Sequence, residues 1–83
     1  MPSAEARAVF DQARQSEKID GKRAIALYQK AVKMENGFAA KRLAEIYEKG
    51  ELGMHRDFQA VLEWWDVAHR LGVNVPRGCG VGR

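Results

Sequence analysis

Apolar residues recur at helical spacing through most of the chain. Near the start, Ala6, Val9, Phe10 and Ala13 follow the i, i+3, i+4, i+7 pattern that places side chains on one face of a helix. No stretch alternates apolar and polar residues for long enough to indicate a β-strand. The pattern therefore predicts an all-α protein.

Cap residues divide this pattern into four helices. Asp20, Asn36 and Asp57 are favoured N-cap residues, because their side chains accept hydrogen bonds from free backbone N–H groups. Gly50 and Gly72 are typical residues at which helices stop. The predicted helices span approximately residues 4–16, 21–35, 36–50 and 58–72. The glycine-rich stretch that follows is predicted to be an irregular tail.

The two halves of the sequence are similar to each other after a shift of about 37 residues. Asp20 then falls on Asp57, and Phe10 falls on Tyr47. The paired residues agree in chemistry more than in identity. The chain is therefore predicted to form two stacked antiparallel helical hairpins. The predicted parts are a divergent first hairpin at residues 1–37, a second hairpin at 38–72 and a tail at 73–83.

The second half carries a recognisable order of residues, AAKRLAEIYEKGELGMHRDFQAVLEWWDVAHRLG at residues 39–72. A first helix rich in Ala and Leu ends in a Tyr, a glycine loop follows, and an Asp opens a second helix with an aromatic pair, a small residue and a closing Gly. These positions are Leu43, Tyr47, Gly50, Gly53, Asp57, Trp64, Trp65, Ala68 and Gly72. In this order the segment resembles a Sel1-like repeat, a relative of the tetratricopeptide repeat.

The resemblance extends more weakly to residues 4–37, which keep Asp20, Ala24, Tyr28 and Ala31 but lack the glycine loop. The second copy departs from the family at Ala44 and Val61, where the family favours glycine and alanine, and it has one extra loop residue near Leu52. The resemblance implies a non-catalytic scaffold for protein–protein contacts, without a cofactor, of a kind often found in bacterial signalling or secretion.

In repeats of this type the first helices of successive hairpins line a concave surface, so the resemblance also implies where a partner binds. Outward-facing residues on those helices would grip a peptide or a loop of another protein. The candidate partner-binding residues are Arg7, Asp11, Arg14, Lys41, Arg42, Glu45, Glu48 and Lys49. The simpler interpretation of each single residue is a solvated polar face, on which an i, i+4 pair adds only about 0.2–0.5 kcal/mol.

The adjacent residues Trp64 and Trp65 leave a helix about 100° apart. In a stacked array the second helix of a hairpin packs against its own first helix and against an adjoining repeat. We therefore expect one ring to pack within the hairpin and the other between repeats or at the open end. The alternative is that both rings pack into one ordinary core. The two apolar stripes predicted on this helix are Phe58, Val61, Leu62, Trp65 and Ala68, and Ala60, Trp64, Val67 and Leu71.

No capping helix is predicted after Gly72. Trp64, Val67 and Leu71 are therefore candidate partner-binding or dimer residues at an open end. A second copy of the chain, the tail or another protein would cover them. A structural homodimer, or a fragment of a longer solenoid, is an open alternative with the same fold.

Composition narrows the classes of protein further. With 83 residues, 46% hydrophobic and 30% charged, the chain fits one small globular domain. Cys79 is the only cysteine, so an internal disulfide is excluded and a reducing compartment is expected. The sequence has no apolar run of signal-peptide or membrane-spanning length. We expect a cytoplasmic protein that does not contact a membrane.

Catalysis and nucleic-acid binding are less well supported by the residues. His55, His69 and Cys79 lack the spacing of metal ligands or of a Cys–His pair, so we expect no metal site and no enzymatic activity. The net charge of +3 includes a basic stretch at residues 18–42, with Lys22, Arg23, Lys30 and Lys33. These residues leave a small nucleic-acid-associated protein as the alternative function, although no aromatic stacking platforms lie among them.

Overall fold

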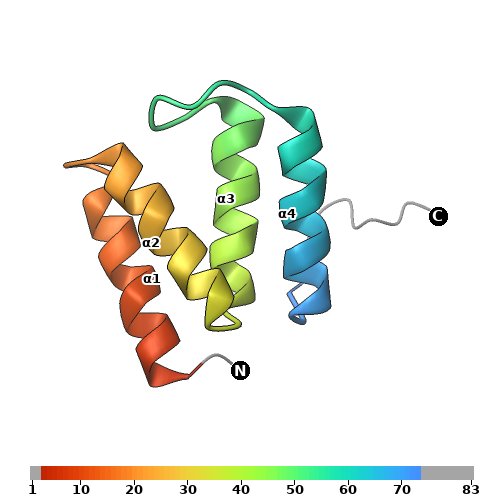
Figure 1. Cartoon of the computed structure of the whole chain (residues 1–83). Helices are drawn as coiled ribbons and strands as arrows, with labels where there is room; N and C mark the ends of the chain where they lie inside the picture. The colour runs from red at the N-terminus through yellow and green to blue at the C-terminus, as the bar shows by residue number, and fades with distance from the viewer. Residues whose placement is uncertain (1–2, 74–83) are drawn as a thin grey trace.

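Four α-helices form the structure, a computed structural model that describes residues 3–73 (Figure 1). They are α1 (Ala4–Ser16), α2 (Gly21–Lys33), α3 (Gly37–Lys49) and α4 (Phe58–Arg70). No strand occurs within residues 3–73. The all-α prediction is confirmed, and the helix bounds agree closely with those expected from the caps. Most of the predicted tail, residues 74–83, lies outside the described residues.

Each helix begins at a side chain that caps it. The Ser3 hydroxyl accepts from the Ala6 N–H at 3.1 Å. Asp20 and Asp57 do the same for the residues three positions further on, at 3.3 and 3.2 Å. Asn36 accepts from the Phe38 N–H at 3.0 Å. At the other end of α3, Gly50 takes a left-handed φ of 71°, a backbone conformation that glycine adopts without steric cost.

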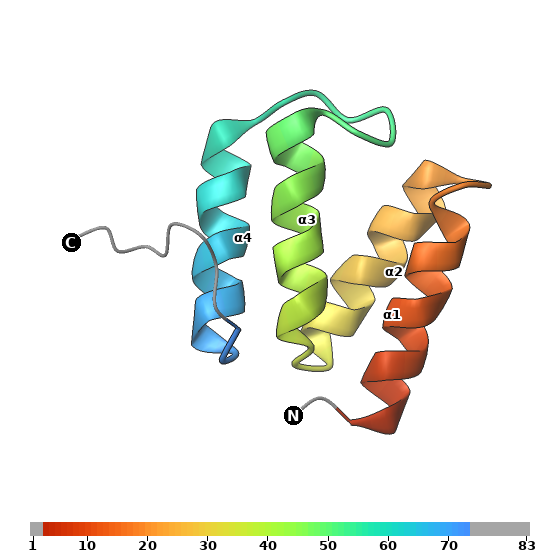
Figure 2. The ribbon, with the colours of Figure 1, turned by 180° about the vertical axis from the view of Figure 1, so that it is seen from behind.

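The helices pair in chain order. Helices α1 and α2 form one antiparallel hairpin, α3 and α4 form the second, and α2 packs against α3 to join them. Figures 1 and 2 show α1 and α2 at one end of the molecule and α4 at the other, with the first hairpin inclined to the second. This arrangement confirms the predicted pair of stacked hairpins.

The relation between the two hairpins differs from the predicted single shift. Helices α2 and α4 keep the register that places Asp20 on Asp57. Counted from the first residues of α1 and α3, however, Phe10 matches Leu43 and not Tyr47. The predicted register is wrong for the first helices because the loop between α3 and α4 is longer than the loop between α1 and α2.

Two apolar clusters fill the interior. The first is shared by α1, α2 and α3, and its buried members are Ala13, Ala24, Ile25, Tyr28, Ala31, Ala39, Leu43 and Ile46. The second lies within the α3–α4 hairpin and consists of Ala44, Val61 and Trp65. Trp64 is half-buried and packs against both clusters. Trp65 thus packs within the second hairpin, whereas Trp64 packs both there and against the core shared with the first hairpin, so the predicted division between the two rings is only partial.

Candidate protein-binding groove

A groove of about 470 Å³ lies between α1 and α3. Its lining comes from the second half of α1 with the residues just after it, and from α3 between Phe38 and Glu45. The lining residues are Phe10, Arg14, Glu17, Lys18, Phe38, Lys41, Arg42 and Glu45. Of the residues predicted on a concave surface, the structure brings Arg14, Lys41, Arg42 and Glu45 together here.

The other four predicted concave residues do not line this groove. Arg7, Asp11, Glu48 and Lys49 are exposed. Asp11 lines a smaller neighbouring depression of about 380 Å³ that also includes Arg14. Their role in binding stays a prediction.

Sequence reasoning missed Phe10, Glu17, Lys18 and Phe38 as groove residues. The apolar spacing places Phe10 on the same helix face as Ala6 and Ala13, yet Phe10 is only half-buried. A signal was present in the sequence, because each first helix carries a Phe one turn before a basic residue. No comparable local pattern marks Glu17 or Lys18.

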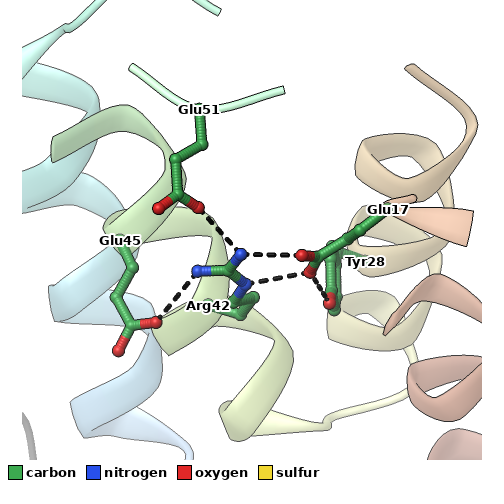
Figure 3. A network of polar contacts seen from close by, with 5 residues as sticks. All are labelled: Glu17, Tyr28, Arg42, Glu45 and Glu51. Carbon is green, nitrogen blue, oxygen red and sulfur yellow. Dashed lines mark hydrogen bonds and ion pairs between the residues drawn. The ribbon is translucent and has the colours of Figure 1, made fainter. Parts of the chain in front are cut away.

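Arg42 lies at the centre of a polar network that joins the two walls at one end of the groove (Figure 3). Its Nε and Nη2 atoms donate to the two carboxylate oxygens of Glu17, at 2.9 and 2.7 Å. Nη2 also donates to Glu51 at 2.8 Å, and Nη1 donates to Glu45 at 3.2 Å. A guanidinium that engages a carboxylate with two parallel bonds fixes direction as well as distance. This contact therefore sets the position of α3 relative to the end of α1.

Tyr28 of α2 extends the network below the groove. Its hydroxyl donates to Glu17, and its ring meets Phe10 edge-on, with centroids 5.6 Å apart. Tyr28 is fully buried. One buried side chain thus joins α2 to both the polar and the aromatic residues that α1 contributes.

The network shifts the pKa values of its members. Hydrogen bonds from Arg42 hold the pKa of Glu17 below its usual value against the opposing effect of burial, and the Tyr28 hydroxyl helps. Burial and the bond to Glu17 raise the pKa of Tyr28. The Glu17 hydrogen bonds raise the pKa of Arg42. Glu17 and Arg42 are therefore both charged at neutral pH, and Arg42 is already engaged by three carboxylates.

The other three cations of the groove, unlike Arg42, have no carboxylate partner among the described residues. Within residues 3–73, Arg14, Lys18 and Lys41 make no ion pair. Beside them Phe38 is 52% exposed, unusually open for an aromatic side chain. The groove thus presents aromatic surface and positive charge to solvent.

A second exposed surface lies on α4. Phe58 and Leu62, one turn apart, are 62% and 46% exposed. They line a shallow depression with Gln59, Glu63 and Asp66. The prediction that Phe58 and Leu62 belong to a buried stripe is wrong, because the buried residues of α4 are Val61, Trp65 and Ala68.

The residues predicted at an open end take other positions. Trp64 packs against both apolar clusters, and Val67 is half-buried. Leu71 is half-buried, and a Cβ built on Gly37 would lie 2.9 Å from the Leu71 Cβ. The most exposed apolar residues of α4 are thus Phe58 and Leu62, and binding by Trp64, Val67 and Leu71 stays a prediction.

The predicted repeat positions mostly have structural roles. Leu43, Trp65 and Ala68 are buried, and Asp57 caps α4. The Asp57 N–H donates to the Tyr47 carbonyl at 3.1 Å, which closes the loop between the helices of the second hairpin. Among the glycines of residues 3–73, Gly50, Gly53 and Gly72 take a left-handed φ.

The remaining candidate chemistry is dispersed. No group of three or more His, Cys, Asp or Glu side chains that could hold a metal occurs in the described part of the chain. His55 and His69 are exposed, and Cys79 lies outside the described residues. None of the described helices has the length and apolar character needed to cross a bilayer.

Comparison with known proteins leaves the family open, since no protein-family model, curated protein or solved structure matches this chain. The groove between α1 and α3 is therefore the main structural indication of function.

Proposed function

We propose that this chain is a non-catalytic protein-interaction module that binds a short segment of a partner protein in the groove between α1 and α3. The observation that carries the proposal is the division of charge in the groove. Arg42 is held by Glu17, Glu45 and Glu51, so its guanidinium is already engaged within the chain. The remaining cations and Phe38 face solvent without such partners.

A preformed groove favours binding because little ordering is left to be done when the ligand arrives. The Arg42–Glu17 contact fixes one end of the groove. Near the other end, Asn36 donates to the Ala6 carbonyl at 3.2 Å and is itself buried. Two polar links between the hairpins therefore support a groove of stable shape.

The resemblance of residues 39–72 to a Sel1-like repeat supports the same role, since such repeats act as scaffolds for protein contacts. A bacterial origin and a cytoplasmic location belong to this proposal. The lone cysteine supports the location, because disulfide-stapled secreted domains use cysteines in pairs.

Association with nucleic acid is the alternative function, and it rests on α2. Lys22, Arg23, Lys30 and Lys33 are all exposed there. Such residues would contact phosphates, and affinity for a DNA or RNA oligonucleotide would then fall steeply with salt. An oligonucleotide affinity that does not depend on these four basic residues removes this alternative.

Selection from a random peptide display library tests the proposed function. The groove variant carries Phe38→Ala and Lys41→Ala, and the matched control carries Gln29→Ala and Lys30→Ala on the exposed side of α2. We expect peptides selected on the natural chain to bind the control and to lose binding to the groove variant. Equal binding to both variants would show that the groove is not the binding site.

A further inference from the structure

The two ends of the groove differ in chemistry. On α1, Phe10 precedes Arg14 by one turn, and on α3, Phe38 precedes Lys41 by about one turn. Helices α1 and α3 run in the same direction (Figure 1). Both aromatic residues therefore lie toward one end of the groove, and the cations lie toward the other.

The cationic end is suited to an anionic ligand. Glu17 and Glu45, the carboxylates that line the groove, both accept hydrogen bonds from Arg42. Arg14, Lys18 and Lys41 make no ion pair with any described residue. The groove lining holds four cations and only two carboxylates, so a ligand carboxylate would meet net positive charge there, whereas a ligand cation would be repelled.

The aromatic end is suited to an apolar side chain. Phe38 is 52% exposed, and Phe10 is half-buried with its ring held edge-on by Tyr28. An aromatic or large aliphatic side chain placed here would remove apolar surface from water on both partners. Because Phe10 is fixed by Tyr28, this end of the groove is already ordered before binding.

The distance between the aromatic and the cationic residues of the groove determines how far apart the matching ligand groups must lie. One helical turn rises about 5.4 Å, and an extended peptide rises about 3.3 Å per residue, so one turn of the groove corresponds to about two ligand residues. We infer that the groove binds an acidic segment of a partner protein in which an aromatic or large aliphatic side chain lies about two residues from a carboxylate. This inference rests on the proposed function.

Fluorescence anisotropy of the full chain with four labelled synthetic peptides tests the inference. The first peptide carries one Phe with carboxylates two residues away on each side. The second peptide replaces both acidic residues by Lys, and the third replaces the Phe by Ser. The fourth keeps the same residues but places the Phe five residues from the nearest carboxylate. We expect the first peptide to bind about tenfold more tightly than the second, since reversal turns attraction into repulsion. We expect its affinity to fall with added salt.

Single variants assign the two halves of the ligand to the two ends of the groove. Lys41→Glu should weaken binding of the first peptide about tenfold, whereas the matched exchange Lys30→Glu on α2 should change it less than about twofold. Phe38→Ala should abolish the preference for the first peptide over the third. Phe38 is largely exposed, so this variant is expected to stay folded, which circular dichroism checks.

The peptide selected by display serves as the reference ligand. If that peptide binds in the groove but the charge-reversed peptide binds as tightly as the acidic one, the inference is overturned and the proposed function still holds. Equal affinity of the first and fourth peptides would overturn the predicted spacing. Insensitivity of every peptide, including the selected one, to the groove variants would overturn the proposed function itself.

Discussion

At the scale of single residues, Arg42 shows how position and role can differ. The repeat pattern correctly places it on the groove side of its helix, where the sequence suggests a ligand contact. In the structure its guanidinium is occupied by Glu17, Glu45 and Glu51. Charge-assisted bonds of this geometry are among the stronger polar contacts in proteins. Arg42 is thus better understood as the residue that holds the groove together.

The Glu17 contact predicts a pH-dependent stability. Because the pKa of Glu17 in the folded chain lies below its unfolded value of 4.5, its carboxylate stabilises the fold above that pH. The stabilisation is lost as the pH falls through the folded pKa. Glu17→Gln should lower the free energy of unfolding by about 1–2 kcal/mol at pH 7. The difference between variant and natural chain should shrink at pH 3.

Denaturant unfolding at the two pH values measures this effect, with the exposed Glu48→Gln on α3 as the matched control. The control should change stability little at either pH. A loss for Glu17→Gln that is the same at pH 3 as at pH 7 would mean that the ion pair with Arg42 does not carry the effect.

At the scale of helices, local signals in the sequence were sufficient to place all four elements. Asp20, Asn36 and Asp57 act on N–H groups two or three residues away, so a cap can be recognised without knowing the fold. The second role of Asn36 could not be recognised in this way. Its side-chain amide binds the Ala6 carbonyl of another helix, a partner that only the packing of the hairpins supplies.

The two tryptophans should respond differently to truncation. Trp65 is buried inside the second hairpin, so Trp65→Ala should cost roughly 3–5 kcal/mol and unfold much of the protein. Trp64 is half-buried between the two clusters, so Trp64→Ala should cost less, roughly 1–3 kcal/mol. Thermal unfolding followed by circular dichroism measures both. A larger loss for Trp64→Ala than for Trp65→Ala would contradict this assignment.

The start of α3 packs closely against the residues that follow α4. A Cβ added at Gly37 would lie 2.7 Å from the Val73 side chain and 2.9 Å from that of Leu71. Gly37→Ala should therefore destabilise the fold by roughly 1–3 kcal/mol, although alanine is the better helix former. Addition of Val73→Ala should recover part of the loss in denaturant unfolding. Greater stability of Gly37→Ala alone would show that the two segments are not in contact.

At the scale of the whole molecule, the sequence located the groove only in part. Helical periodicity shows which side chains point outward, and this was sufficient for Arg14 and Lys41. It does not show how far apart two helices lie or how they tilt, and these determine which outward residues share one groove. Lys18, beyond the end of α1, and Phe38, at the start of α3, enter the groove for this reason.

The exposed apolar residues at the two ends of the molecule indicate how two copies of the chain would associate. One end carries Phe58 and Leu62 beside the acidic Glu63. The other carries Ile19, 86% exposed, in a stretch where the exposed Lys18, Lys22 and Arg23 outnumber the acidic Asp20. Opposite charges around exposed apolar residues favour a head-to-tail contact between two copies. Light scattering after size-exclusion chromatography should show a mass that rises with concentration.

Variants test this contact because a head-to-tail interface uses two different surfaces. Leu62→Glu and Ile19→Glu should each abolish the rise in mass, since each damages one surface. An equimolar mixture of the two variants should still form a pair, because each supplies the surface that the other lacks. A mass that stays at 9.3 kDa for the natural chain at every concentration would exclude self-association.

The central claim is that the groove between α1 and α3 is where this protein meets its partner. Amide chemical-shift mapping of the isotope-labelled chain, titrated with the peptide selected by display, tests it most directly. The largest changes are predicted at Arg14, Lys18, Phe38 and Lys41, with α4 little affected. Changes centred on Phe58 and Leu62, or on the exposed lysines of α2, would contradict the claim.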